Sequence, residues 1–362
     1  MSSRRLIRVL VIDDSAFSRR TITRMLETSP LVEVVDVARD GEEALRKTLE
    51  LKPDLVTLDL EMPRMDGFTF LRLVMAKLPT PVMVISGRAG EEDTFKALDL
   101  GAVDFIGKPT RRATPALQTI QEELIRKVHA IRDLRIDKVK ERIVAAPRVL
   151  ERREPALVPD PSRVVVIGSS TGGPAALMQT FGAWTEAPAC AFLVAQHMPE
   201  GFTRGFAERL DRLTPFEVAE ARGGEDLRPG RVLIAPGGHH LELESRGGRV
   251  VTRVVPSQAG DKYTPSVDRL FSSAAKHIGS DLLAVVLTGM GDDGRMGAGE
   301  VRESGGKVIA ESEETAVIFG MPQQAIRAGH VDEVLPLNEV PAAIQAGMRR
   351  NPAKRSVRGG AT

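Results

Sequence analysis

The stretch Gly168-Ser169-Ser170-Thr171-Gly172 places a serine between two glycines, in the pattern G-x-S-x-G. An apolar run precedes it and Pro174 follows it, as expected where a strand turns sharply into a helix. Such a turn exposes the hydroxyl of Ser170 as a nucleophile. The stretch lacks the lysine of a phosphate-binding loop and the middle glycine of a dinucleotide-binding fingerprint. A glycine-rich turn without chemistry stays open as the alternative, because this short pattern is common.

A serine nucleophile needs a base and an acid that orients the base. His197 directly follows the apolar run 191–196, and Asp293 follows the apolar run 282–289 in a glycine-rich turn. The carboxyl ends of parallel strands lie at one edge of a sheet, so we expect Ser170, His197 and Asp293 to meet there. Their order along the chain differs from the Ser, Asp, His order of α/β-hydrolases, which predicts a different fold. The aspartate could also belong to a plain turn.

A second set of polar residues follows the apolar runs of the first hundred residues. It consists of Asp13, Asp14, Asp59, Ser86 and Lys108. Three carboxylates at one sheet edge repel one another unless a hard cation lies between them, and an oxygen-only site suits Mg²⁺. One carboxylate can then attack a phosphoryl donor, while the lysine neutralises the phosphoryl oxygens and the serine donates a hydrogen bond. A single aspartate of this kind would be explained as a helix cap.

The pattern "VLVIDDS…LVTLDLEMPRMDG…PVMVIS…GAVDFIGKP" closely resembles the receiver domain of bacterial two-component response regulators, over about residues 5–125. The resemblance implies a flavodoxin-like fold with Asp59 as the phosphoacceptor. It also implies that Asp13, Asp14 and Asp59 hold Mg²⁺. The resemblance further implies that Ser86, Lys108 and Phe105 sense the phosphoryl group. Phe105 is at the position of an aromatic residue that moves on activation in receivers.

Apolar runs separated by helical patterns predict the fold class α/β. In the first part they cover 7–12, 33–38, 54–60, 81–86 and 103–107, which indicates a flavodoxin-like receiver with a five-stranded parallel sheet. In the second part they cover 164–168, 191–196, 231–236, 282–289 and 307–312, which indicates a second doubly wound α/β domain. Two alternating strands joined at Arg246-Gly247-Gly248 add an antiparallel β-hairpin.

Composition divides the chain into a receiver domain (1–125), a charged helix to about Ile143 with a proline-rich linker (126–162), a catalytic domain (163–348) and a basic tail expected to be disordered (349–362). The linker is either a solvated tether or a segment that docks on the second domain or a partner. A net charge of +1 gives no field directed at nucleic acid. The single cysteine, Cys190, and the lack of a long apolar stretch predict a cytoplasmic protein without membrane insertion.

The whole chain resembles the chemotaxis-type protein-glutamate methylesterases, in which a receiver precedes the esterase domain. The matching stretches are "IGSSTGGPAAL", "QHMPEGFTRGFAERL", "YTPSVDRLFSSAA", "VVLTGMGDDGRMG" and "GMPQQAI". The resemblance implies a catalytic triad of Ser170, His197 and Asp293, with Met290 and Thr171 near the oxyanion. One departure is Ser169, where the family usually has alanine.

This resemblance implies a phosphorylation-activated serine esterase that removes methyl groups from glutamate γ-methyl esters on chemoreceptors, releases methanol and also deamidates receptor glutamines. Methyl-accepting chemoreceptors would be the substrate and a histidine kinase the phosphodonor, in chemotaxis adaptation. We expect no cofactor in the catalytic domain, because the pair His239 and His240 lacks a third metal ligand.

Two other functions remain open. A receiver often drives a DNA-binding domain, but the β-rich pattern of the second part and the near-zero net charge argue against it. The second domain could also be a phosphorylation-gated binding scaffold with a vestigial triad, although all three triad residues are present.

Overall fold

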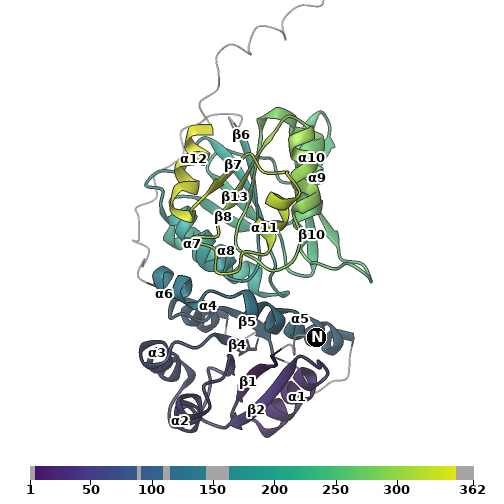
Figure 1. Ribbon diagram of the computed structural model, residues 1–362. Helices are drawn as coiled ribbons and strands as arrows, with labels where there is room; N and C mark the ends of the chain where they lie inside the picture. Colours follow the sequence, from purple (N-terminus) through teal and green to yellow (C-terminus); the bar gives the residue numbers. More distant parts are fainter. Residues whose placement is uncertain (1–4, 88–90, 109–114, 144–162, 348–362) are drawn as a thin grey trace, which may run out of the picture.

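The computed structural model describes residues 5–87, 91–108, 115–143 and 163–347, and shows two α/β domains in direct contact (Figure 1). The expected linker after residue 143 and the expected basic tail lie outside the described residues. No helix within these ranges has the length and apolar character needed to cross a membrane.

The first domain is a parallel five-stranded sheet in the order β2-β1-β3-β4-β5, which confirms the flavodoxin-like arrangement. The strands are β1 (Ile7–Ile12), β2 (Val32–Ala38), β3 (Leu55–Leu58), β4 (Val82–Ser86) and β5 (Asp104–Gly107). The helices are α1 (Ala16–Glu27), α2 (Gly41–Leu51), α3 (Gly67–Lys77), α4 (Glu91–Asp99) and α5 (Pro115–Ala130). Each expected apolar run coincides with a strand to within a few residues. The inner strands β1 and β3 are largely apolar because they are buried, whereas the edge strand β2 is only partly buried and includes Glu33 and Asp36.

The expectation of one long helix reaching Ile143 was wrong. Helix α5 ends at Ala130, a 3₁₀ turn (Ile131–Asp133) follows, and α6 covers Ile136–Ile143. Leu134 adopts an extended conformation and pairs with Ile318 of the second domain. The backbone N–H of Arg135 donates to the carbonyl of Val317 at 3.0 Å. The helix is interrupted because these backbone groups bind the second domain instead of continuing the helical ladder.

The second domain is a parallel seven-stranded sheet in the order β14-β13-β12-β6-β7-β9-β8, with a separate two-stranded hairpin. The strands are β6 (Arg163–Ser169), β7 (Cys190–Gln196), β8 (Glu217–Glu220), β9 (Arg231–Ile234), β12 (Leu282–Val286), β13 (Lys307–Glu311) and β14 (Glu333–Leu335). The hairpin consists of β10 (His239–Arg246) and β11 (Arg249–Pro256), and its two turn glycines have positive φ. The doubly wound sheet and the hairpin are confirmed, and the short edge strands β8 and β14 are additional.

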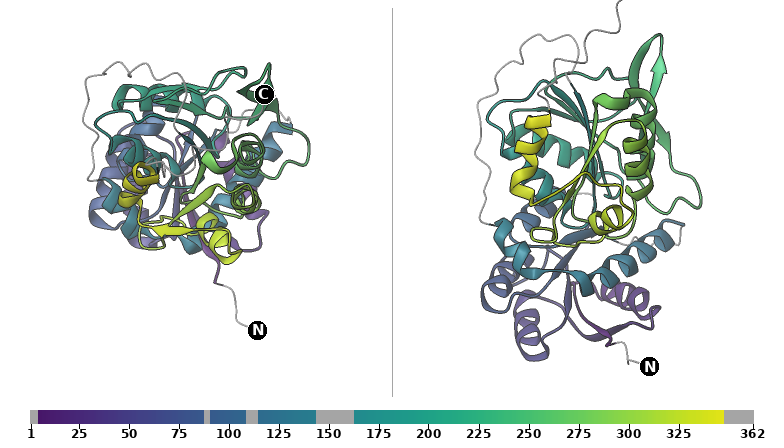
Figure 2. Two further views of the ribbon diagram at one scale, coloured as in Figure 1. Left: turned by 90° about the horizontal axis from the view of Figure 1, so that it is seen from above. Right: turned by 45° about the horizontal axis from the view of Figure 1, so that its top comes forward.

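Helices cover both faces of this sheet (Figure 2). Side chains alternate along β6, so Val165 and Ile167 pack on one side and Val164 and Val166 on the other. The first side carries α7 (Gly173–Gly182), α8 (Phe202–Leu213) and α12 (Val340–Gly347). The second carries α9 (Val267–Ile278), α10 (Arg295–Glu303) and α11 (Met321–Arg327). The sheet is therefore a buried scaffold whose strand ends present the functional residues.

The two domains share one apolar core, in which aromatic rings from both sides meet. Phe105 of β5 packs on Phe202 with ring centroids 4.7 Å apart, and Phe95 of α4 lies 5.6 Å from Phe206. In Figure 1 the elements α4, β5, α5 and α6 form the side of the first domain that faces the second. The first domain thus contacts the second next to the strand ends described below.

Candidate active site

Three neighbouring strands of the second sheet deliver the predicted triad residues to one edge. Ser170 follows β6, His197 follows β7, and Asp293 lies in the loop between β12 and α10. The sheet order places β12, β6 and β7 side by side. The backbone N–H of Ser170 donates to the carbonyl of Thr288 after β12, and that of His197 donates to the carbonyl of Ser169, both at 3.0 Å. The structure therefore brings these three residues together, as the strand-end argument expected.

The glycines of the G-x-S-x-G stretch have identifiable structural roles. Gly172 has a φ of 77°, a conformation that other residues rarely adopt, and it caps the start of α7. A Cβ atom on Gly168 would lie 2.2 Å from a methyl carbon of Val267, so this glycine allows the start of α9 to approach β6. The motif is thus a tight strand-to-helix turn with a second helix packed against it.

The two adjacent serines have different surroundings. Ser169 is fully buried, and its hydroxyl donates to the side-chain oxygen of Gln196 at 2.6 Å. The Gln196 amide in turn donates to the carbonyls of Ser170 and His197, both at 2.9 Å. Gln196 therefore fixes the turn and the histidine together, a role that no motif in the sequence indicated. The Ser169 hydroxyl is therefore engaged in a buried hydrogen bond, which favours the prediction that Ser170 is the reactive serine.

The Asp293 carboxylate is held at the start of α9. It accepts His197 Nε2–H at 2.8 Å, the backbone N–H of Val267 at 2.7 Å and that of Asp268 at 2.9 Å. Burial acts to raise the pKa of Asp293, but the hydrogen bond and charge interaction with His197, together with the backbone N–H donors, prevail and lower it. An ionised Asp293 keeps the proton on Nε2, which leaves Nδ1 of His197 as the nitrogen with a free lone pair.

The predicted oxyanion residues have different partners. A Cβ atom on Gly289 would lie 2.7 Å from the Cβ of Ser170, so the backbone leading to Met290 packs directly on the serine. The Thr171 hydroxyl, in contrast, donates to the carboxylate of Asp104 in the first domain. Asp104 also binds the buried ammonium of Lys127 at 2.9 Å. The first domain thus makes a direct hydrogen bond to the residue next to Ser170.

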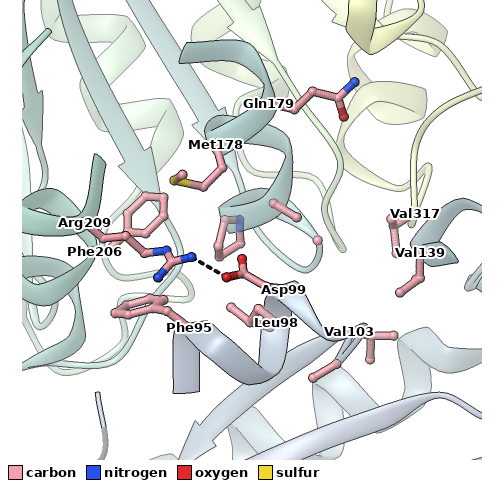
Figure 3. Close-up of a pocket in the computed structure, with 14 residues that line it drawn as sticks. Phe95, Leu98, Asp99, Val103, Val139, Met178, Gln179, Phe206, Arg209 and Val317 are labelled. Carbon is pink, nitrogen blue, oxygen red and sulfur yellow. Dashed lines mark hydrogen bonds and ion pairs between the residues drawn. The ribbon is translucent and has the colours of Figure 1, made fainter. Parts of the chain in front are cut away.

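A small cavity of about 70 Å³ lies beside this contact, between the two domains (Figure 3). Its lining is mostly apolar and includes Phe95, Met178 and Phe206. At its edge Asp99 of α4 forms an ion pair with Arg209 of α8 (Figure 3). The interface therefore combines apolar packing with charge pairs between α4 and α8, because Arg212 of α8 also lies 3.7 Å from Glu92 of α4.

The first domain gathers its acids as expected. Ligand atoms of Asp13, Asp14 and Asp59 lie within 4.8 Å of one another, and Lys108 Nζ is 2.6 Å from Asp59 and 3.2 Å from Asp13. Burial and the nearby Asp13 charge raise the pKa of Asp59 to about 6, although Lys108 opposes this rise. Crowded oxygen donors of this kind fit a hard divalent cation. Ser86 ends β4, and its side chain lies outside the described residues.

Asp268, at the start of α9, leads to a prediction on how the stability of the fold depends on pH. Burial and the charge of Asp293 raise the pKa of Asp268 from 3.8 to about 6. Between these values the folded chain holds a proton that the unfolded chain releases, so this group makes the fold less stable as the pH rises through the window. Asp268→Asn should therefore raise the melting temperature by a few degrees at neutral pH, and by less at about pH 4. Calorimetric scans of both proteins test this, with Glu303→Gln at an exposed position of α10 as the control. An equal gain at both pH values would contradict it.

Comparisons with known proteins match both domains. The family model of the CheB methylesterase matches residues 165–344, and that of the response regulator receiver domain matches residues 9–118. A protein-glutamate methylesterase/protein-glutamine glutaminase of Geobacter sulfurreducens is 50% identical over 93% of this chain and 96% of its own length. One of Myxococcus xanthus is 51% identical over 97% and 99%. The crystal structure of the Thermotoga maritima CheB methylesterase catalytic domain is 43% identical, with a TM-score of 0.48, over 50% of this chain and 96% of that one. The chain therefore belongs to the protein-glutamate methylesterase/protein-glutamine glutaminase family, with a response regulator receiver domain at its N-terminal side.

Proposed function

We propose that this protein is a phosphorylation-activated serine esterase that hydrolyses glutamate γ-methyl esters on chemoreceptors and deamidates receptor glutamines. The observation that carries the proposal is the placement of Ser170 beside the His197–Asp293 pair at three adjacent strand ends. Family membership supplies the substrate class, since relatives that match almost the whole chain carry both activities in their names. The reaction fits adaptation in chemotaxis-type signalling.

In the proposed first step, the Ser170 oxygen attacks the carbonyl carbon of the ester and His197 takes the hydroxyl proton on Nδ1. Asp293 stabilises the imidazolium through its bond to Nε2. No hydrogen bond joins Ser170 to His197 in the conformation described, in which the receiver contacts the serine loop. Catalytic hydrogen bonds that are absent in resting structures commonly form with substrate bound.

The negative oxygen of the tetrahedral intermediate needs hydrogen-bond donors near Ser170. Within the described part of the chain, the backbone N–H groups of Thr171 and Met290 have no acceptor, and both flank the serine. His197 then protonates the leaving methoxide, and methanol departs. Water activated by the same histidine hydrolyses the acyl-enzyme to free glutamate. A glutamine side chain follows the same path with ammonia as the leaving group.

The receiver supplies regulation. Asp59 would accept the phosphoryl group from a histidine kinase, with Mg²⁺ held by Asp13, Asp14 and Asp59 and the phosphoryl oxygens contacted by Ser86 and Lys108. The ion would neutralise the crowded carboxylates and the incoming phosphate. We place the enzyme in the cytoplasm, where the kinase and the methylated receptor segments would meet it. A DNA-binding role is disfavoured, because the second domain is a seven-stranded sheet with helices on both faces.

The unphosphorylated receiver is proposed to inhibit the esterase by covering the serine edge. A receptor helix is bulky and needs open access to Ser170, whereas Thr171 is bonded to receiver residue Asp104. Phosphorylation at Asp59 would change the position of Phe105, which packs on Phe202 of the catalytic domain. The alternative is that the receiver only delivers the esterase to its receptors.

The adjacent serines provide a matched pair of variants. Ser170→Ala should lower methanol release from methylated receptors by at least about a thousandfold, because losing a triad member removes most of the catalysis. Ser169→Ala should keep most of the activity, since that hydroxyl only binds Gln196. Comparable losses in both variants, or a loss of less than about tenfold in Ser170→Ala, would refute the nucleophile assignment and favour a binding scaffold.

Phosphorylation should be confined to Asp59. Incubation of the full chain with acetyl phosphate and Mg²⁺ should add one phosphoryl group, and Asp59→Asn or chelation of the metal should prevent the addition, because the acidic cluster repels the donor without the ion. Intact-mass spectrometry measures the product. Phosphate remaining in the Asp59→Asn variant would show that another residue is the acceptor.

Variants of the Asp99–Arg209 ion pair test whether docking of the receiver inhibits the esterase. Asp99→Arg or Arg209→Asp alone should raise the esterase activity of the unphosphorylated chain by roughly three- to tenfold, since about 1.4 kcal/mol of docking energy corresponds to a factor of ten. The double variant should restore inhibition, because the pair is re-formed with exchanged charges. A fragment starting near Val158 should be more active than the unphosphorylated full chain. A fragment that is no faster, with single variants equal to wild type, would favour recruitment over occlusion.

A further inference from the structure

Tyr263, the only tyrosine of the chain, lies flat against the imidazole of His197. The two ring centroids are 5.0 Å apart and the ring planes differ by 10°. The tyrosine belongs to the loop between β11 and α9, whereas the histidine follows β7. The contact therefore covers one face of the imidazole, while Asp293 binds its edge through Nε2.

The phenol is anchored to the residue beside Asp293. The Tyr263 hydroxyl donates to Asp292 Oδ1 at 3.0 Å, and Lys262 Nζ binds the same oxygen at 2.6 Å. A Cβ atom on Gly291 would lie 2.2 Å from the phenol oxygen, so the turn before the aspartates is shaped around the tyrosine. The two adjacent aspartates therefore have different partners. Asp293 binds Nε2 at the edge of the His197 ring, and Asp292 binds the hydroxyl of Tyr263, whose ring covers the face of His197.

We propose that Tyr263 is a positioning residue for the esterase reaction. The inference rests on the function proposed above, in which His197 is the base. An imidazole that is hydrogen-bonded only at Nε2 can still turn about its Cβ–Cγ bond, and this turn changes the direction in which Nδ1 points. An aromatic ring stacked on its face prevents this rotation. The electron-rich face of the phenol also favours the positive imidazolium that forms when the serine attacks.

The stacking predicts a specific pattern of kinetic losses. Tyr263→Phe keeps the flat ring and loses only the hydroxyl, so kcat should stay within about threefold of wild type. Tyr263→Leu removes the ring and should lower kcat by about tenfold or more with little change in KM, because the contact acts on the base during the reaction rather than on substrate binding. Gln258→Ala, on the exposed part of the same loop, is the matched control and should have wild-type kinetics.

The experiment uses the full chain, kept phosphorylated with acetyl phosphate and Mg²⁺, and measures methanol release from membranes that carry methylated chemoreceptor. Melting temperatures are recorded for every variant. If Tyr263→Leu does not fold, Tyr263→Met takes its place, since it fills a similar volume without a flat ring. The proposal is supported if kcat stays close to wild type in Tyr263→Phe and falls in Tyr263→Leu or Tyr263→Met.

Two results would overturn it. Wild-type kcat in the folded leucine or methionine variant would show that the ring does not position the base. An equal loss in the phenylalanine variant would assign the effect to the hydroxyl and Asp292 instead of the stacking. Ser170→Ala and His197→Ala, assayed alongside, separate this failure from failure of the proposed function: if both retain activity, the esterase mechanism is wrong irrespective of Tyr263.

Discussion

The arrangement of the catalytic domain depends on one electrostatic constraint, a carboxylate that stays ionised although almost no water reaches it. Asp293 is 2% exposed, and an unpaired charge there would be strongly unfavourable. The start of α9 supplies backbone N–H donors, and His197 supplies another. Gly168 allows that helix to lie close enough to β6. The orientation of the imidazole follows from this charge, because Nε2 is the nitrogen that contacts Asp293.

The interface between the domains contains a second buried charge. Asp104 accepts a hydrogen bond from the Thr171 hydroxyl of the second domain and forms an ion pair with Lys127 of its own domain. Lys127 also lies 3.2 Å from Glu123. A buried ion pair adds little net stability, but losing one partner is costly. Such a network favours one docking geometry over others. Asp104 is at the start of β5, next to Phe105 and four residues before Lys108, so the contact with the serine loop and the lysine that binds Asp59 belong to the same short segment.

The positions of the candidate site residues could be predicted because they lie at strand ends. Apolar strands that end at polar residues predicted where Ser170, His197 and Asp293 would lie, and the same rule predicted that Asp13, Asp14 and Asp59 would lie close together. The short strands β8 and β14 were missed because edge strands of three or four residues with glutamates carry little apolar pattern. The interruption between α5 and α6 was missed because it arises from backbone hydrogen bonds to the other domain.

The sequence also did not predict the roles of residues whose contacts are distant along the chain. Gln196 gave no signal beyond its position before His197, although its amide donates hydrogen bonds to the carbonyls of both Ser170 and His197. Tyr263 lies 66 positions from the histidine it covers, within a loop that has no periodic pattern. Thr171 was placed near the oxyanion by resemblance, but nothing in the sequence indicated its bond to Asp104. Such pairings are set by the packing of complete elements.

The hydrogen bond between Thr171 and Asp104 also has a consequence for the receiver when a receptor segment binds the second domain. If docking of the receiver and binding of a receptor segment exclude each other at this loop, their free energies are linked, and linkage is reciprocal. A receptor segment that occupies the serine edge then disfavours docking of the receiver to the same degree that docking disfavours binding of the receptor segment. Clusters of receptors would thereby hold the enzyme in the form that is most readily kept phosphorylated, so the concentration of substrate becomes an input to the switch that controls the enzyme.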